Sequence, residues 1–239
     1  MDNFYDILAN SAVAAGFDLN AGQIAAMESY YRLLVEWNQR MNLTAITEPH
    51  EVAVKHMIDS LSCYRADIFT AGASVVDVGT GAGFPGVPLK IFRPELCLTL
   101  MDSLNKRLTF LREVVNTLPL VGVDLVHVRA EEAGRSKLYR EVYQIAVSRA
   151  VARLNVLCEL CLPLVKTGGW FIALKGAHYE EEVREAAKAL SVLGGRIEAV
   201  QPVSLPGLAD KRAVIYIRKA ASTPEIYPRK AGTPEKKPL

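Results

Sequence analysis

Apolar residues recur at helical spacing through the first 70 residues of the chain and then give way to short continuous runs. Residues 3–15 and 21–39 carry apolar side chains near the helical period, with few residues that break a helix. A third helix is predicted to open at residues 48–50, where a proline follows a glutamate, and to run to about residue 64. Residues 1–70 therefore predict an N-terminal helical cap.

From residue 73 onward, β-rich runs alternate with segments of helical length. The predicted strands are residues 74–78, 97–101, 123–128, 143–147, 170–174 and 214–217, with a further strand at 197–203. Helical segments such as 105–117, 155–165 and 180–190 lie between them. Because several strands are almost wholly apolar, we expect a parallel sheet covered on both faces. Residues 71–219 therefore predict an α/β fold, a doubly wound, mostly parallel Rossmann-like sheet.

Composition and charge distinguish the end of the chain from the rest. Residues 220–239 contain four prolines and no apolar periodicity, so we expect a basic, proline-rich tail that is extended or disordered. The formal net charge of +2 is unevenly divided, with −5 in residues 1–70, +3 in residues 71–217 and +4 in residues 218–239. A polyanion is expected to meet the middle of the chain and the tail.

Several classes of protein are excluded by composition. Half of the residues are hydrophobic, which excludes a disordered chain, and four cysteines are too few for a disulfide framework. Cys158 and Cys161 lie in an apolar helical run without a second pair at zinc spacing, so we expect two core thiols and no metal site. No apolar run reaches the roughly 18–20 residues that span a bilayer, and the acidic N-terminus is unlike a secretory signal. We expect a soluble, cytoplasmic protein without a membrane partner.

The most informative motif joins a buried strand to a glycine-rich loop. Gly79, Gly81 and Gly83 stand at alternate positions after Asp77, where they permit positive φ and let a ligand lie against bare backbone. A purely structural turn is one alternative. The dinucleotide pattern G-x-G-x-x-G is also formally present from Gly81, but prolines at 85 and 88 remove donors that a pyrophosphate would need. The acid followed by G-x-G-x-G is typical of S-adenosylmethionine methyltransferases.

Acidic residues after the next two strands extend this candidate site. Asp102 ends the second strand about twenty residues after the loop, where a carboxylate can accept both ribose hydroxyls; capping of the next helix is the alternative. Ala130 and Glu131 follow the third strand, where an adenine can lie, although Glu131 can equally open a helix. The order of these residues on successive strand ends favours a nucleoside-containing cofactor.

Further motifs, in a fixed order along the chain, resemble one family. They are MNLTAIT at 41–47, His56 with DSL at 59–61, DVGTGAGFPG at 77–86, DS at 102–103 with KR at 106–107 and FL at 110–111, SRAVA at 148–152, KG at 175–176, and YPRK, GTP and PL within 227–239. Together they resemble the RsmG (GidB) family of bacterial methyltransferases, which modify N7 of a guanine in small-subunit (16S) ribosomal RNA. The resemblance covers about residues 30–239.

The resemblance implies a class I S-adenosylmethionine-dependent methyltransferase fold, S-adenosylmethionine as cofactor, and 16S ribosomal RNA or the small ribosomal subunit as partner. It places the family's cofactor contacts on Gly79, Phe84, Ala130, Glu131 and Arg149. Gly81, Gly83 and Asp102 join them through the physical arguments above. We expect a monomer.

Guanine N7 carries an in-plane lone pair and no proton at neutral pH, so methyl transfer to it is an in-line displacement that needs no general base. The protein has to align the two atoms and exclude water. Arg149, at the end of the fourth strand, is the best candidate for a working side chain. It can hold the cofactor carboxylate, guanine O6 or a phosphate, and a salt bridge to a carboxylate such as Asp77 is the alternative. His56 is expected to tie the cap to the sheet rather than to act as a base.

Basic side chains near the strand ends are candidates for phosphate contacts with RNA. They are Lys106, Arg107, Arg129 and Lys175, and in the tail Arg229 and Lys230. A solvated helix face is the alternative for Lys106 and Arg107. Two rival functions stay open, an NAD-dependent oxidoreductase and a non-enzymatic RNA-binding or ribosome-assembly factor.

Overall fold

The N-terminal part of the chain is helical, as the apolar spacing predicts. The computed structural model describes residues 3–239, and here these helices are α1 (Phe4–Ala14), α2 (Ala21–Asn38), and a continuous helical stretch of α3 (Pro49–Val52), the π-helical turn η1 (Ala53–Ile58) and α4 (Asp59–Leu61). Asn3 caps α1, and Asn20 and Gln23 form a capping box that begins α2. The three predicted helical segments are confirmed.

The remaining chain forms a seven-stranded sheet in the order β3-β2-β1-β4-β5-β7-β6. The strands are β1 (Ser74–Val78), β2 (Cys97–Asp102), β3 (Val123–His127), β4 (Tyr143–Arg149), β5 (Val165–Lys175), β6 (Gly195–Pro202) and β7 (Ala213–Lys219). Strands β1 to β5 are parallel to one another, whereas β7 runs antiparallel to both β5 and β6. The doubly wound, mostly parallel sheet is confirmed. β5 begins five residues before the predicted strand, because a pair of glycines at 168–169 interrupts its apolar pattern.

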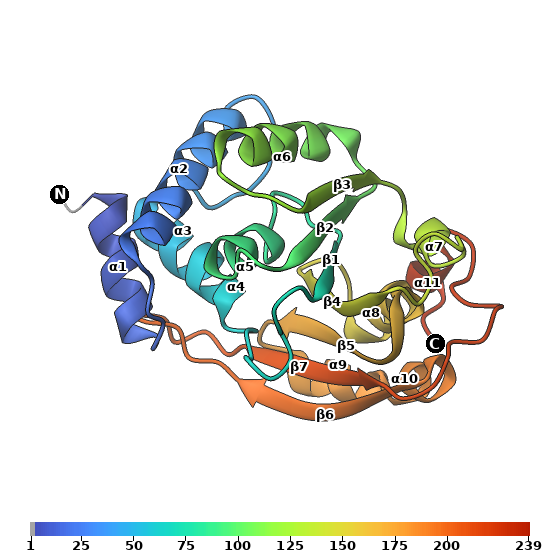
Figure 1. Ribbon diagram of the computed structural model, residues 1–239. Coiled ribbons are helices and arrows are strands. Elements are labelled where there is room, and N and C mark those ends of the chain that lie inside the picture. Colours follow the sequence, from blue (N-terminus) through green and yellow to red (C-terminus); the bar gives the residue numbers. More distant parts are fainter. Residues whose placement is uncertain (1–2) are drawn as a thin grey trace.

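Helices between the strands cover both faces of the sheet (Figure 1). They are α5 (Gly86–Phe92), α6 (Asn105–Thr117), α7 (Ala130–Ala133), α8 (Leu154–Cys161) with the 3₁₀ turn η2 (Leu162–Leu164), α9 (Tyr179–Glu185) and α10 (Ala187–Leu193), and the short helix α11 (Thr233–Lys236) follows the last strand. None of the helices within residues 3–239 has the length and apolar character needed to cross a membrane.

Two apolar cores lie on opposite faces of the sheet, because successive strand residues point to opposite sides. Val75 faces a core shared with the N-terminal helices, α5 and α6, whereas Val76 faces a core shared with α7, α8 and α10. Cys158 and Cys161 lie fully buried in the second core, which confirms them as core thiols. The N-terminal helices thus pack directly on the sheet that carries the loops of the site.

The C-terminal tail does not have the extended or disordered structure predicted from its composition. Residues 223–236 pack against α7 and α8 and end in the short helix α11 (Figure 1). The guanidinium of Arg229 pairs with Glu159 of α8, with Nη2 and Oε2 2.5 Å apart. Because these partners are 70 residues apart, the composition of the tail contains no sign of the contact.

Candidate functional site

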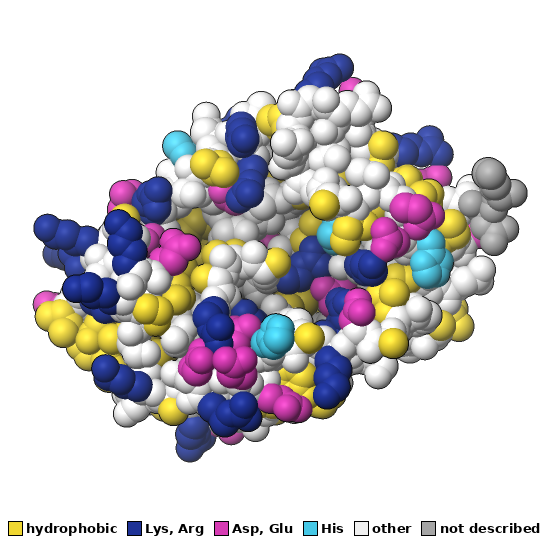
Figure 2. All heavy atoms as spheres, turned by 180° about the vertical axis from the view of Figure 1, so that it is seen from behind, with side chains coloured by type: hydrophobic (Ala, Val, Ile, Leu, Met, Phe, Trp, Pro, Cys, Tyr) yellow, Lys and Arg dark blue, Asp and Glu magenta, His cyan; other side chains and the backbone are white. Residues whose placement is uncertain are grey.

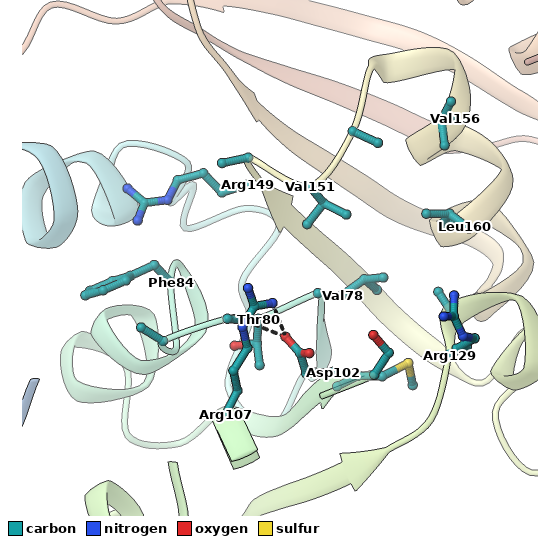
Figure 3. Close-up of a pocket in the computed structure, with 18 of the residues that line it drawn as sticks. Val78, Thr80, Phe84, Asp102, Arg107, Arg129, Arg149, Val151, Val156 and Leu160 are labelled. Atoms are coloured by element: carbon teal, nitrogen blue, oxygen red, sulfur yellow. Dashed lines mark hydrogen bonds and ion pairs between the residues drawn. The ribbon is translucent and has the colours of Figure 1, made fainter. Parts of the chain in front are cut away.

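A cavity of about 490 Å³ opens at the carboxyl ends of β1 to β4. Parallel strands place the loops that follow them at one edge of a sheet, where such folds bind ligands. Here those loops supply most of the lining, the helical cap adds Thr44 and His56, and the tail adds Pro234 and Glu235. Figure 3 shows the lining side chains, from Phe84 and Arg149 on one side to Val156 and Leu160 on the other.

Two of the three loop glycines line the cavity. Gly79 and Gly81 have φ of 70° and 60°, in the left-handed region that favours glycine. A Cβ on Gly79 would lie 2.6 Å from Cγ2 of Val151. Gly83 is not among the lining residues, and a Cβ there would lie 2.7 Å from the hydroxyl of Tyr30. Gly83 therefore allows the loop to pack on α2 instead of facing a ligand.

Asp77 stabilises the glycine loop by hydrogen bonds and does not itself line the cavity. Its Oδ2 accepts hydrogen bonds from Oγ1 of Thr80 at 2.8 Å and from the backbone N–H of Gly86 at 2.9 Å. Its Oδ1 is buried and has no hydrogen-bond partner within residues 3–239. Complete burial raises the pKa of Asp77 to about 6, and the two hydrogen bonds to its carboxylate oppose that rise. Asp77 thus shapes the loop from outside the cavity.

Asp102 lines the cavity between the glycine loop and α6 (Figure 3). Its Oδ2 accepts from the N–H of Gly81 at 2.9 Å and from Nη1 of Arg107 at 3.2 Å, and its Oδ1 accepts from the N–H of Leu104 at 2.9 Å. The carboxylate therefore fixes the loop and the start of α6 together. Asp102 also lies in the cavity wall, where it can contact a ribose; this contact stays a prediction.

The end of the cavity beyond Asp102 is predominantly apolar. Ala130 and Glu131 border it at the start of α7, and Arg129 is exposed beside them; the adenine contact expected at Ala130 and Glu131 stays a prediction. The apolar lining here consists of Met101, Val128, Val156, Leu160 and Pro234. The carboxylate of Glu131 accepts a hydrogen bond from the N–H of Gly232 in the tail at 2.8 Å. A flat aromatic group fits such walls.

Arg149 forms the opposite end of the cavity. Its Nη1 donates to Oδ2 of Asp59 and to the carbonyl of Lys55, both at 2.8 Å, and its guanidinium carbon lies 5.0 Å from the centre of the Phe84 ring. Figure 3 shows the guanidinium directed toward the pale blue helices of the N-terminal part. The salt bridge considered as an alternative is thus present, but its partner is Asp59 and not Asp77. Asp59 lies 90 residues away in sequence, on α4.

His56 links the helical cap to this end of the sheet. Its Nε2 lies 2.9 Å from Oγ1 of Thr44, and its Nδ1 lies 3.3 Å from Nη2 of Arg149, which confirms the tie predicted between the cap and the sheet. Burial, and secondly the charge of Arg149, lower the pKa of His56 to about 4. The ring is therefore neutral at pH 7 and a weak base.

A second cavity of about 320 Å³ adjoins the first, and the two share His56, Arg149 and Ala150 as a wall. Asp59 lies in the second cavity and also accepts from Nη1 of Arg212 at 2.9 Å through Oδ1. Ala150 has a φ of 56°, a strained conformation for a residue with a side chain. Sequence reasoning did not identify Arg212, which no motif marks, or the carboxylate role of Asp59, although DSL at 59–61 belongs to the family motifs.

The six candidate RNA contacts fall into two groups. Lys106, Arg129 and Lys230 are exposed. Lys175 is buried against Glu182 at 2.6 Å, and Arg107 and Arg229 contact the carboxylates described above. Figure 2 shows Lys and Arg side chains interspersed with Asp and Glu over one hollowed face. The uneven charge of the sequence therefore does not appear on that face as one continuous basic patch.

Comparison with known proteins gives a match to one family over most of the chain. The profile of the family described as GidB, rRNA small subunit methyltransferase G, matches residues 23–213. A protein of Desulforamulus reducens named ribosomal RNA small subunit methyltransferase G is 51% identical over 239 residues, all of both chains. A protein of the same name from Staphylococcus carnosus is 52% identical over 222 residues, 92% of each chain.

Solved structures with the same fold are much more distant in sequence. The [4+2]-cyclase SpnF superposes with a TM-score of 0.59 at 14% identity, over 84% of this chain and 97% of that one. A SAM-dependent O-methyltransferase of Thermotoga maritima superposes with a TM-score of 0.52 at 16% identity, over 80% and 72%. At these identities the likeness shows the fold alone, the class I methyltransferase fold with an antiparallel β7.

Proposed function

The chain belongs to the rRNA small subunit methyltransferase G (GidB) family, and from this premise we propose that it methylates N7 of a guanine in 16S ribosomal RNA. As a member of this family it is an S-adenosylmethionine-dependent methyltransferase. The proposal concerns the atom that is methylated, the way the reaction proceeds and the residues that take part.

The observation that supports this proposal best is the arrangement of the first cavity along four strand ends. The missing Cβ atoms of Gly79 and Gly81 leave bare backbone, over which a methionine moiety can lie. Asp102 follows at the place of a ribose, and Ala130 begins the apolar end that suits adenine. S-adenosylmethionine, bound in this order, supplies an electrophilic methyl group on a sulfonium. That group then lies toward Arg149.

The second cavity suits the acceptor, because it meets the first at the wall where the methyl group arrives. Both oxygens of Asp59 accept hydrogen bonds from guanidinium groups, and His56 is neutral with Nε2 bound to Thr44. These groups are suited to orienting a base and poorly suited to removing a proton. Attack by N7 needs no proton removal, so orientation and exclusion of water are sufficient.

Phosphate contacts are assigned to the exposed cations around the first cavity. Lys106, Arg129 and Lys230 have free access to solvent, and we expect them to position the RNA backbone. Lys175 is buried on Glu182, so its role is to hold the β5 end in place. Arg107 is half-exposed and can serve Asp102 and a phosphate together.

Labelled methyl transfer to small ribosomal subunits tests the proposal directly. Subunits isolated from cells that lack the gene are incubated with the protein and labelled S-adenosylmethionine, and the modified nucleotide is mapped. We expect one N7-methylguanine in 16S RNA. Label on another atom, or no label, contradicts the proposal, and the second result favours a binding factor.

Two variants connect this activity to the site. Arg149→Ala is expected to abolish transfer, whereas Arg196→Ala, the same change on the exposed face of β6, is expected to leave it unchanged. Wild-type turnover in Arg149→Ala removes Arg149 from the site. A thermal shift with S-adenosylhomocysteine and none with NAD distinguishes this function from an NAD-dependent oxidoreductase.

A further inference from the structure

The C-terminal tail reaches the cofactor cavity and forms part of its lining. Pro234 and Glu235 border the apolar end of the cavity, across from the loops of the sheet. The N–H of Gly232, two residues before Pro234, donates to the carboxylate of Glu131. We call residues 223–236 the C-terminal strap. Its turn at 232–235, which comprises Gly232 and the start of α11, supplies the two lining residues, and Figure 1 shows α11 next to α7 and α8.

The strap is anchored by Glu159, a residue of α8 with a buried carboxylate. Glu159 is 1% exposed, and every hydrogen bond that it accepts within residues 3–239 comes from Arg229. The backbone N–H and Nε of Arg229 donate to Oε1 at 2.7 and 2.9 Å, and Nη2 donates to Oε2 at 2.5 Å. A buried carboxylate is strongly unfavourable without such a partner. Helix α8 therefore requires the strap to be in place.

Residues after α7 provide a second set of anchors. Arg140 donates to the carbonyl oxygens of Thr223 and Tyr227 at 2.5 and 2.8 Å, and Arg135 donates to that of Pro228 at 2.6 Å. Gly134 leaves room for the strap, since a Cβ there would lie 2.8 Å from Cγ of Pro228. These contacts fix the backbone of the strap. A flexible basic arm that becomes ordered only on binding RNA would not require them.

We propose that the turn at 232–235 is a component of the cofactor site, in which Pro234 forms the outer wall against the adenine ring. Glu131 then serves as a positioning residue that holds the turn through Gly232. The inference rests on the proposed function, because it takes the first cavity as the place of S-adenosylmethionine. An adenine between Pro234 and the apolar residues Val128, after β3, and Val156 and Leu160 of α8 loses contact with water on both faces, which stabilises its binding.

The wall and the ligand must stabilise each other, because coupling between two binding events is reciprocal. The cofactor product S-adenosylhomocysteine is therefore expected to hold the strap in place. Trypsin can cleave after Lys230 and Lys236, which are exposed, and to enter its active site the backbone there has to leave the packed conformation. We expect saturating S-adenosylhomocysteine to slow this cleavage at least fivefold, as followed by mass spectrometry of the full chain.

The decisive variant removes the wall and keeps the anchor. A chain ending at Lys230 retains Arg229 on Glu159 but lacks the turn at 232–235. We expect it to bind S-adenosylhomocysteine at least tenfold more weakly in isothermal titration calorimetry. The control is the full chain with Lys236→Ala and Lys237→Ala, which lowers the charge by two, retains the turn and is expected to bind within twofold of the wild type.

A point variant covers the case in which the shortened chain does not fold. Pro234→Asp in the full chain places a charge in the apolar wall and is expected to weaken S-adenosylhomocysteine binding by a similar factor. Binding within twofold of the wild type in this variant, or in a folded chain ending at Lys230, overturns the inference. Failure of the wild type to bind S-adenosylhomocysteine overturns the assignment of the cavity itself. Unchanged cofactor affinity together with a flatter salt dependence of RNA binding in the shortened chain shows an RNA-binding arm instead.

Discussion

Asp59 holds together the wall between the two cavities, and Asp59→Ala tests that role. Its two oxygens accept hydrogen bonds from Arg149 at 2.8 Å and from Arg212 at 2.9 Å. The side chains of both arginines are mostly buried, at 14% and 17% exposure. Removing the carboxylate leaves Arg149 without its counterion and Arg212 with only the exposed carboxylate of Asp210, 3.4 Å from its Nη2. The Nε of Arg212 already has no partner within residues 3–239.

The size of the effect follows from burial. Removing one partner of a buried ion pair costs about 3–5 kcal/mol of unfolding free energy. Because some solvent reaches both guanidinium groups of the wall, we expect the lower end of this range, about 3 kcal/mol. In a chain of this length, about 3 kcal/mol corresponds to a fall in Tm of roughly 6–12 °C. Asp59→Asn keeps one acceptor oxygen and is expected to fall between the wild type and Asp59→Ala.

Two measurements and one control make this prediction specific. Urea unfolding followed by circular dichroism gives the stability, and labelled methyl transfer, measured below the variant's Tm, gives the activity. We expect Asp59→Ala to lose at least 90% of kcat/KM, because Arg149 loses the carboxylate that holds its guanidinium in place. We expect S-adenosylhomocysteine to bind to this variant within a few fold of the wild type. Asp67→Ala, which breaks an exposed pair with Arg65, is expected to change neither quantity. A Tm within 2 °C of the wild type with normal turnover refutes the reasoning.

Three further predictions concern the same end of the sheet. The pKa of His56 is about 4 in the folded protein, below the ordinary value of 6.5. Between these two pH values the unfolded chain therefore binds more protons than the folded protein does. The His56 contribution to the unfolding free energy, about 3 kcal/mol, is complete above pH 6.5 and is lost as the pH falls to about 4. Asp77, whose pKa is raised to about 6, contributes a change of opposite sign over the same range. The His56 contribution is therefore measured as a difference: the urea stability of the wild type relative to His56→Gln should fall by about 3 kcal/mol between pH 6.5 and pH 4. Gly79→Ala should weaken S-adenosylhomocysteine binding at least tenfold, because its Cβ meets Val151, whereas Gly72→Ala, at a similar φ in open space, should not. Tyr30→Phe removes the hydrogen bond from the buried hydroxyl to the carbonyl of Ala82 in the glycine loop, and urea unfolding should show a loss of about 1–2 kcal/mol.

The elements of the fold could be predicted because their signals are local. The apolar run at 74–78 and the helical spacing at 105–117 each lie within one element, and the structure has both with the same bounds. The π-helical turn η1 inside the third helical stretch has no such signal, since its apolar residues also fit an α-helix. The bounds of β5 were missed because Gly168 and Gly169 interrupt the apolar pattern within the strand.

The site could be predicted only as far as strand ends define it. Gly79, Asp102 and Ala130 line one cavity because each follows a parallel strand, which the order of the motifs already indicates. The partners of Arg149 and Arg229 were missed, since Asp59 and Glu159 lie 90 and 70 residues away in sequence. Such pairs depend on tertiary packing, about which charge and composition contain no information.

Because β7 runs in the reverse direction, different segments of the chain line most of the two cavities. Because β7 runs antiparallel, its first residue, Ala213, lies beside Lys175 at the end of β5, and Arg212 reaches the same edge as the parallel strand ends. The second cavity is therefore lined by the end of β4, by residues 174–176, 203 and 212–214, and by the helical cap, whereas the loops after β1, β2 and β3 line only the first. Insertions before β7 can thus remodel the second cavity while the loops that line the first stay as they are. Chimeras that exchange residues 203–212 between relatives test whether the second cavity determines the RNA target.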